Sequence, residues 1–201
     1  MKNKTKYEQY MQRFLEENSK INLISKNEEN FLWEKHVFDS LGAELFFEKY
    51  TTSLRDKTLL DIGTGGGFPS VPLAIRYPEL KITALDSIRK KLSAIENITR
   101  DLGIKNITIL NDRAENLTLK YDFITSRAVA TLDKISSYAL PLLKKDGYFI
   151  AYKSRKTDEE INNAQTILKR LGGEIVDILS YRLPLEETYE RNLIIIKKIK
   201  N

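Results

Sequence analysis

The sequence predicts an α/β fold built on a seven-stranded, mostly parallel sheet with one antiparallel strand. An apolar run at residues 58–62 leads into a glycine-rich turn and then into a helix, as in the first unit of a doubly wound sheet. From there strand-like and helix-like segments alternate, which is typical of βαβ units. The last two strand-like runs have no helix between them, so we expect them to form a hairpin that reverses one strand.

Residues 1–57 are expected to form a helical extension in front of this sheet. Hydrophobic residues recur at helical spacing between Tyr7 and Leu15, and a second helical segment follows over residues 31–47. No linker, repeat or low-complexity tract separates the extension from the core at residues 58–201. The sequence therefore predicts one domain over the whole chain.

The strands and helices of the core are bounded by local signals. Pro69 suits the first turn of a helix, and Pro78 and Gly103 suit the ends of the first two helices. The expected helices span residues 69–77, 88–102, 132–143 and 158–171. The expected strands span residues 58–62, 81–85, 107–110, 121–125, 148–152, 174–183 and 193–199.

Composition limits the functions that the chain can have. At 201 residues and 41% hydrophobic content it is an ordinary globular protein, and its net charge of +5 favours an anionic partner only weakly. The absence of cysteine excludes disulfides, thiolate zinc sites and cysteine nucleophiles. With a single histidine, we expect no metal. The chain shows neither a signal peptide nor a run long enough to span a bilayer, so we expect a cytoplasmic protein without a membrane partner.

Residues 61–67 read D-x-G-x-G-x-G and predict a binding site for S-adenosylmethionine (SAM). A dinucleotide fingerprint, G-x-G-x-x-G, would need glycine at position 68, where this chain has Phe68. Glycines allow tight turns and let backbone N–H groups approach a ligand without an intervening Cβ atom. We therefore expect cofactor contacts at Asp61, Gly63, Gly65, Gly67 and Phe68. The alternative is a plain glycine-rich turn between a strand and a helix.

Further cofactor contacts are expected where the next strands end, because ligands of doubly wound sheets bind at the carboxyl ends of strands. Asp86 ends the second strand and can accept both ribose hydroxyls, or alternatively it caps the following helix. Ala114 and Glu115 follow the third strand, where they can border the adenine unless they belong to a solvated turn. Arg127 follows the fourth strand and is either a site residue or the partner of Asp122 or another acid in an ion pair.

The sequence also restricts the methyl acceptor. Methyl transfer to C5 of a pyrimidine generally uses a cysteine nucleophile, which this chain lacks. Methyltransferases of exocyclic amino groups usually carry Asn/Asp-Pro-Pro-Tyr after the fourth strand, where this chain has Thr-Ser-Arg-Ala. Guanine N7 has an in-plane lone pair and no proton to remove, so it needs no general base. Arg127, Lys153 and Arg191 could orient a guanine through O6 and the phosphates, although Lys153 and Arg191 could equally be solvated charges.

The single histidine, His36, lies in a segment where Asp39 and Ser40 share its helical face. This polar patch could hold the extension against the core, or it could line the mouth of the substrate site. The sequence leaves both interpretations open.

The run D-I-G-T-G-G-G-F-P-S-V-P over residues 61–72 resembles the RsmG (GidB) family of bacterial small-subunit rRNA guanine-N7 methyltransferases. Matches continue in the family's order along nearly the whole chain, at Asn22-Leu23, His36 with Asp39-Ser40, Leu85-Asp86-Ser87, Arg113-Ala114-Glu115, Ser126-Arg127-Ala128, Lys153 and Arg191. The chain departs from the family's pattern at Ser70, Ser154, Tyr189 and Asn192.

The resemblance implies a Rossmann-like, SAM-dependent methyltransferase that acts on N7 of one guanine in the decoding region of 16S rRNA. Its partner would be small-subunit rRNA or the small-subunit particle, and the protein is expected to be a monomer. The resemblance implies SAM contacts at Gly63, Phe68, Ala114, Glu115 and Arg127. It places His36, Lys153 and Arg191 at or near the guanine, and with Arg127 these are the expected catalytic residues.

Two other functions are compatible with the same fold. A methyltransferase of small molecules would turn over free metabolites and would not show salt-sensitive RNA binding. A non-catalytic protein of ribosome assembly could keep a vestigial pocket, although the complete glycine motif together with Asp86 argues against it. A nicotinamide oxidoreductase is disfavoured by Phe68.

Overall fold

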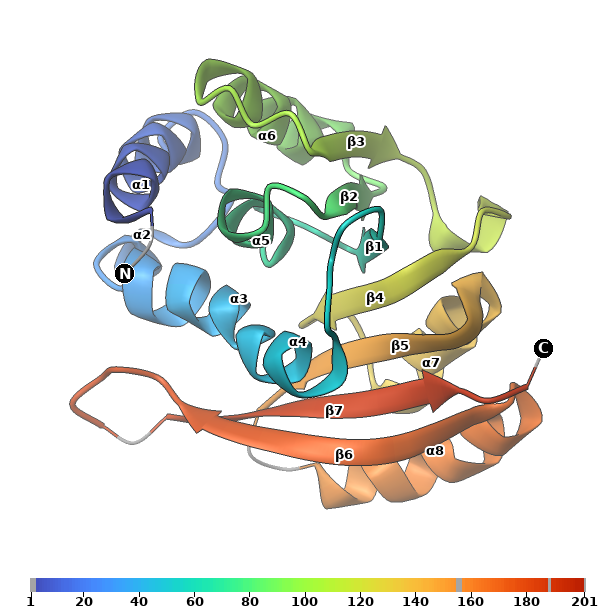
Figure 1. Cartoon of the computed structure of the whole chain (residues 1–201). Coiled ribbons are helices and arrows are strands. Elements are labelled where there is room, and N and C mark those ends of the chain that lie inside the picture. Colours follow the sequence, from blue (N-terminus) through green and yellow to red (C-terminus); the bar gives the residue numbers. More distant parts are fainter. Residues whose placement is uncertain (1–2, 155–156, 188, 201) are drawn as a thin grey trace.

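The computed structural model describes residues 3–154, 157–187 and 189–200, and it contains one seven-stranded sheet in the order β3-β2-β1-β4-β5-β7-β6 (Figure 1). All neighbouring pairs from β3 to β5 are parallel, whereas β7 is antiparallel to both β5 and β6. The predicted sheet and its terminal hairpin are therefore confirmed. The strands are β1 (Thr58–Ile62), β2 (Lys81–Asp86), β3 (Ile107–Asn111), β4 (Tyr121–Arg127), β5 (Leu143–Lys153), β6 (Gly173–Arg182) and β7 (Glu190–Lys198).

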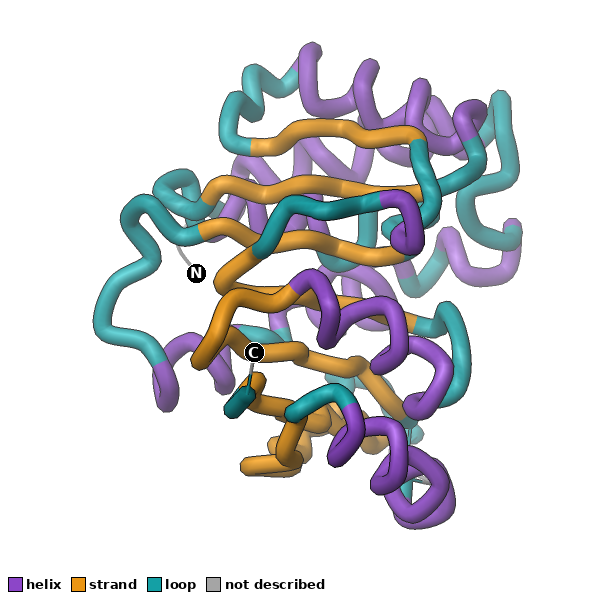
Figure 2. Tube along the Cα trace, turned by 90° about the vertical axis from the view of Figure 1, so that its right-hand side faces the viewer, coloured by secondary structure: helices purple, strands orange, loops and turns teal. Residues whose placement is uncertain are grey.

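Helices cover both faces of this sheet (Figure 2). Alternate side chains of each central strand point to opposite faces, so Leu59 belongs to one hydrophobic cluster and Leu60 to the other. The first cluster takes residues from α1 (Lys4–Asn18), α4 (Glu44–Tyr50), α5 (Ser70–Arg76) and α6 (Arg89–Asp101), and Leu41 of α3 (Asp39–Leu41) packs against it. The short helix α2 (Lys26–Glu29) has no buried residue. The second includes α7 (Leu132–Ala139) and α8 (Asp158–Arg170).

The N-terminal extension is part of the core. The rings of Tyr10 and Phe14 on α1 lie 6.3 and 5.1 Å from the ring of Phe68, in the loop that follows β1. Phe46 on α4 contacts Phe123 of β4 at 5.8 Å between ring centroids. The extension therefore fixes one wall of the loop after β1 as well as covering a face of the sheet.

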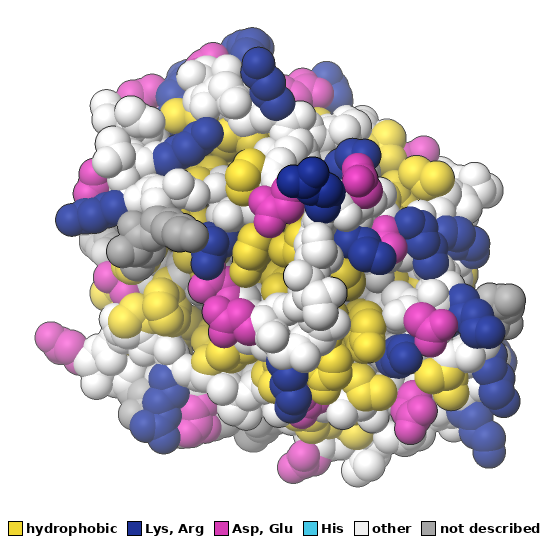
Figure 3. Space-filling model, in the orientation of Figure 1, with side chains coloured by type: hydrophobic (Ala, Val, Ile, Leu, Met, Phe, Trp, Pro, Cys, Tyr) yellow, Lys and Arg dark blue, Asp and Glu magenta, His cyan; other side chains and the backbone are white. Residues whose placement is uncertain are grey.

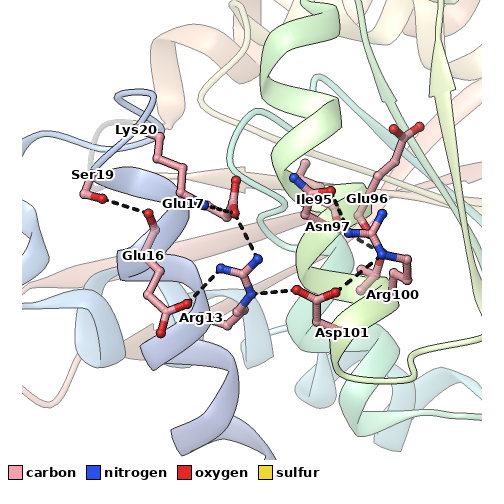
Figure 4. A network of polar contacts seen from close by, with 11 residues as sticks. Arg13, Glu16, Glu17, Ser19, Lys20, Ile95, Glu96, Asn97, Arg100 and Asp101 are labelled. Atoms are coloured by element: carbon pink, nitrogen blue, oxygen red, sulfur yellow. Dashed lines mark hydrogen bonds and ion pairs between the residues drawn. The ribbon is translucent and has the colours of Figure 1, made fainter.

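An ionic network joins the same extension to α6 (Figure 4). Arg13 donates to Asp101 at 2.8 Å, and a second guanidinium nitrogen lies 3.0 Å from a carboxylate oxygen of Glu17. Glu17 is buried and also accepts a hydrogen bond from Lys20, which together with Arg13 lowers the pKa of the Glu17 carboxyl. The network holds α1 beside α6 and so keeps Tyr10 and Phe14 against Phe68.

The largest differences from the predicted boundaries lie at the end of α7 and the start of β5. The helix expected over residues 132–143 ends at Ala139 and continues as a 3₁₀ helix, Leu140–Leu142, because Pro141 has no N–H for an α-helical bond. Strand β5 begins at Leu143 rather than at residue 148. Its charged first residues conceal the strand in the sequence, and Asp146 takes a left-handed backbone conformation within it, with φ of 62°.

No helix among the described residues combines the length and the hydrophobicity that crossing a membrane requires.

Candidate active site

The loop after β1 carries three glycines in the left-handed region, with φ of 72° at Gly63, 55° at Gly65 and 88° at Gly67. A Cβ atom at Gly63 would lie 2.5 Å from a methyl group of Val129. At Gly65 the nearest atom would be 3.9 Å away, so a side chain there would extend into open space. At Gly65 the backbone therefore faces open space without a side chain in between. At Gly63 only glycine fits, because Val129 occupies the space that a Cβ atom would need.

That open space is a cavity of about 640 Å³ at the carboxyl ends of β1, β2 and β4, where the strand order reverses. Its walls combine apolar groups with carboxylates and backbone donors. Seven of the predicted cofactor residues line it, namely Gly63, Gly65, Phe68, Asp86, Ala114, Glu115 and Arg127.

The remaining two predicted cofactor residues, Asp61 and Gly67, lie behind the cavity wall. Asp61 is fully buried in β1 and accepts a hydrogen bond from Thr125 of β4 at 3.0 Å, and burial raises the pKa of its carboxyl to about 6. A Cβ atom at Gly67 would lie 2.8 Å from a methyl group of Val71 rather than in the cavity. The structure thus gives both residues a role in shaping the loop, and their contact with the cofactor stays a prediction.

Asp86 holds both the glycine loop and the turn that precedes α6. One carboxylate oxygen accepts a hydrogen bond from the backbone N–H of Gly65 at 2.9 Å, and the other accepts from the N–H of Ile88 at 2.9 Å, just before α6. The capping alternative of the sequence analysis is wrong, because the N-cap residue of α6 is Ile88 and no side chain caps this helix. Because each carboxylate oxygen has a further lone pair, Asp86 can still accept a hydroxyl from the cavity that it lines.

Arg127, at the end of β4, is clamped by the N-terminal extension. Its guanidinium donates to the carbonyl of Lys35 at 3.0 Å and to the carboxylate of Asp39 at 2.9 Å, and it lies 3.0 Å from Nδ1 of His36. Its carbon centre lies 5.2 Å from the ring centroid of Phe68. Asp39 is thus the ionic partner, whereas Asp122, the partner considered from the sequence, binds Lys57, Thr58 and Lys144 instead.

His36 is buried in a π-helix over Leu32–Phe38, a backbone form that occurs frequently at functional sites. Its Nδ1 faces the Arg127 guanidinium, which can only donate, so Nδ1 carries the lone pair and Nε2 the proton. Burial, and then the charge of Arg127, lower the pKa of the imidazole to about 4. His36 is therefore neutral at physiological pH, with its basic nitrogen already engaged.

A second cavity, of about 570 Å³, adjoins the first along a shared wall that includes Glu28, His36, Arg127 and Val129. It brings together all four predicted catalytic residues, because Lys153 and Arg191 also line it.

The two cations at the far side of this second cavity are paired. The Lys153 ammonium lies 2.5 Å from Glu160 of α8 and donates to the carbonyl of Ala130 at 2.9 Å. The Arg191 guanidinium lies 3.6 Å from Asp39. Neither side chain is the solvated charge that the sequence allowed, because the two side chains are only 12% and 26% exposed.

Three acidic residues of the site were not predicted as site residues from the sequence. Glu28 lies 3.8 Å from Nε2 of His36 on the shared wall, Asp39 binds Arg127, and Glu160 binds Lys153. Asp39 was identified only as part of the polar patch around His36. Glu28 and Glu160 belong to ordinary-looking helical segments, so only the tertiary fold reveals their position. Among the described residues, no group of three or more potential ligands could hold a metal ion.

Comparison with known proteins shows the family of the chain. The chain matches the model of the GidB family, described as rRNA small subunit methyltransferase G, over residues 3–193. It is 40% identical over 202 residues to the ribosomal RNA small subunit methyltransferase G of Staphylococcus saprophyticus, covering 98% of this chain and 82% of that protein. The protein of the same name from Bacillus subtilis is 38% identical over 97% of this chain and 82% of its own length.

Solved structures show the same fold at low sequence identity. M. jannaschii TYW2 in complex with AdoMet superposes with a TM-score of 0.60 at 15% identity, covering 79% of this chain and 77% of that one. Magnesium protoporphyrin IX methyltransferase from Synechocystis, with bound SAM, gives 0.59 at 21% identity, covering 79% and 76%. These likenesses confirm the predicted Rossmann-like fold.

We predict that Gly65→Asp abolishes SAM binding, because a carboxylate side chain would occupy the space into which Gly65 opens. Isothermal titration calorimetry would show no measurable binding heat for the variant. Gly103→Asp is a matched control, since Gly103 also has a positive φ, 61°, and open space around it, but lies outside this cavity. Unchanged SAM affinity in a folded Gly65→Asp protein would contradict the assignment of the cavity.

We also predict that His36 makes the protein less stable as pH falls. The pKa of His36 in the folded protein, about 4, lies below the ordinary value of about 6.5. Between pH 6.5 and pH 4 the imidazole is therefore protonated in the unfolded chain but not in the folded protein. Stability is therefore lost as pH falls from 7 towards 4. Urea unfolding at pH 7 and pH 5 should show that His36→Gln loses about 2 kcal/mol less than the wild type over this interval. Equal losses would show that His36 titrates normally.

Proposed function

Because the chain belongs to the rRNA small subunit methyltransferase G (GidB) family, we propose that it transfers a methyl group from SAM to N7 of a specific guanine in 16S rRNA. The observation that carries the choice of N7 is the state of His36. Its basic nitrogen is occupied by Arg127 and its pKa is low, so it is not arranged to remove a proton from the acceptor. N7 of guanine carries no proton and requires no base.

The residues of the first cavity fit SAM. The backbone is open at Gly65, Phe68 supplies an aromatic wall, and Asp86 and Glu115 supply acceptors for hydroxyl and amino groups. When bound, SAM supplies an electrophilic methyl group, so the protein's task is to place an acceptor lone pair in line with it. The loop from Gly63 to Phe68 would hold the cofactor, and the second cavity would hold the acceptor.

The second cavity suits a guanine nucleotide. Guanine presents the acceptors N7 and O6 on one edge and N–H donors on its Watson–Crick edge. Arg127, Lys153 and Arg191 provide donors, and Glu28 and Glu160 provide carboxylate acceptors, within one lining. Arg127 lines both cavities, and its guanidinium is held by the carbonyl of Lys35, the carboxylate of Asp39 and the ring of His36. A side chain fixed in this way can position the base relative to the cofactor.

We also propose the domain organisation, the location and the partner of the protein. The shared core between the extension, residues 1–57, and residues 58–201 supports a single methyltransferase domain, of which residues 1, 2 and 201 lie outside the described residues. A cytoplasmic monomer that takes small-subunit rRNA or the small-subunit particle as substrate is consistent with the family.

We predict that the protein produces 7-methylguanosine in small-subunit rRNA. Mapping modified nucleotides by mass spectrometry, in 16S rRNA from cells with and without this protein, should show one guanine that loses its N7 methyl group. Incubation of that unmethylated RNA with the purified protein and SAM should restore it. Restored methylation at another atom, or turnover only with free metabolites, would contradict the proposal.

We expect Arg127→Ala to lower kcat/KM for methyl transfer at least tenfold. The substitution removes the guanidinium that lines both cavities and that Lys35 and Asp39 hold in place. Arg100→Ala is the control, since Arg100 is an exposed arginine of α6 with partners of its own at Asn97 and Asp101. SAM affinity measured on the same variants would separate cofactor binding from placement of the acceptor. A normal rate would reassign Arg127 to structure.

A further inference from the structure

A third cavity, of about 500 Å³, lies at the end of the sheet opposite the active site and is lined by five cationic side chains. They come from segments far apart in the sequence: Lys120 precedes β4, Lys144 and Lys145 begin β5, Arg170 ends α8 and Lys198 ends β7. Strand β4 runs from this end to Arg127, so the two sites are about 20 Å apart at 3.3 Å per residue. The lining contains no acidic residue.

Most of this positive charge has no carboxylate partner among the described residues. Lys144 is paired with Asp122 at 2.7 Å, but Asp122 also serves Lys57. Lys120 donates to the carbonyl of Pro141, and Lys198 donates to the carbonyl of Leu171 at 2.5 Å. Lys145 and Arg170 are exposed and enter no hydrogen bond or ion pair of their side chains within the described part of the chain.

Lys198 is the unusual member of this cluster. Its exposed fraction is 8%, although lysine is seldom so deeply buried without an acidic partner. Burial, and then the charge of Lys120, lower the pKa of its ammonium group. An anion in the cavity would provide the missing counter-charge for Lys198. The guanidinium of Arg170 and the exposed ammonium of Lys145 line the same cavity and could contact that anion.

We propose that this cationic cavity is a second RNA-binding site that holds backbone phosphate of the RNA whose guanine occupies the active site. The inference rests on the proposed function. An extended RNA, unlike a small metabolite, is large enough to reach both ends of the sheet and carries a phosphate at every nucleotide. Dark blue side chains are gathered along the right-hand edge of Figure 3, the side on which β7 ends in Figure 1.

The test is the double variant Lys145→Gln/Arg170→Gln, which leaves the buried Lys198 in place. Binding of unmethylated 16S rRNA is measured by fluorescence anisotropy over a series of salt concentrations. Each lost phosphate contact should reduce the magnitude of the slope of log K, the RNA association constant, against log salt concentration by about 0.7. At 0.1 M salt, the loss of one such contact should weaken RNA binding roughly fivefold. We therefore expect a loss of about 5-fold for one shared phosphate and about 25-fold for two.

The matched control is Arg55→Gln/Lys105→Gln. Both residues are exposed and lie in loops that precede β1 and β3, at the same end of the sheet as the cavity. The two substitutions remove the same charge as the test variant, but from positions outside the cavity. RNA affinity of this control should stay within about twofold of the wild type, and SAM affinity should be unchanged in both double variants. Equal losses in the two double variants, or no loss in either, would overturn the proposal.

A second arm distinguishes RNA from a free anion. Thermal unfolding is followed in the presence of inorganic phosphate. If phosphate stabilises the wild type more than Lys145→Gln/Arg170→Gln while both bind RNA equally, the cavity serves a free anion and the RNA assignment is wrong. The proposed methyl transfer is judged separately, from the methylated atom in the wild-type product, so that failure of the cavity proposal and failure of the proposed function can be told apart.

Discussion

The clamp that the N-terminal extension places on Arg127 is the contact on which the site depends. An arginine at the end of β4 would otherwise be free to sample the cleft, but Lys35, His36 and Asp39 engage its guanidinium from three directions. The same contact engages the lone pair on Nδ1 of His36. The imidazole stays neutral because it is buried beside a fixed cation, and both effects disfavour protonation. The position of Arg127 in the second cavity is therefore set by residues that lie outside the α/β core.

This dependence explains why the extension is packed so tightly. Rings of α1 reach Phe68 in the glycine loop, and the Arg13 network ties α1 to α6, which begins next to Asp86. The cofactor loop is thus enclosed between the sheet and the extension, and its two sides meet at Phe68 and Arg127, 5.2 Å apart. Removal of a contact in the extension would alter both cavities, since they share Glu28, His36 and Arg127.

The charges at the two ends of the sheet are arranged differently. Around the active site Arg127, Lys153 and Arg191 each have a carboxylate partner, which fixes the position of the side chain. At the opposite end Lys145, Arg170 and Lys198 have no carboxylate partner among the described residues, an arrangement that suits a polyanion held mainly by charge. The modest net charge of +5 conceals this contrast.

The sequence by itself determined the features that depend on local order: the glycine loop, the alternation of strands and helices, and the polar residues at strand ends from Asp86 to Arg127. These follow from backbone geometry and from the fact that parallel strands end at one edge. Only the tertiary structure decided which partner each charge has. Asp39 rather than Asp122 meets Arg127, Asp61 and Gly67 lie behind the cavity, and Lys198 is buried among cations, because such contacts join residues many tens of positions apart that no local pattern relates.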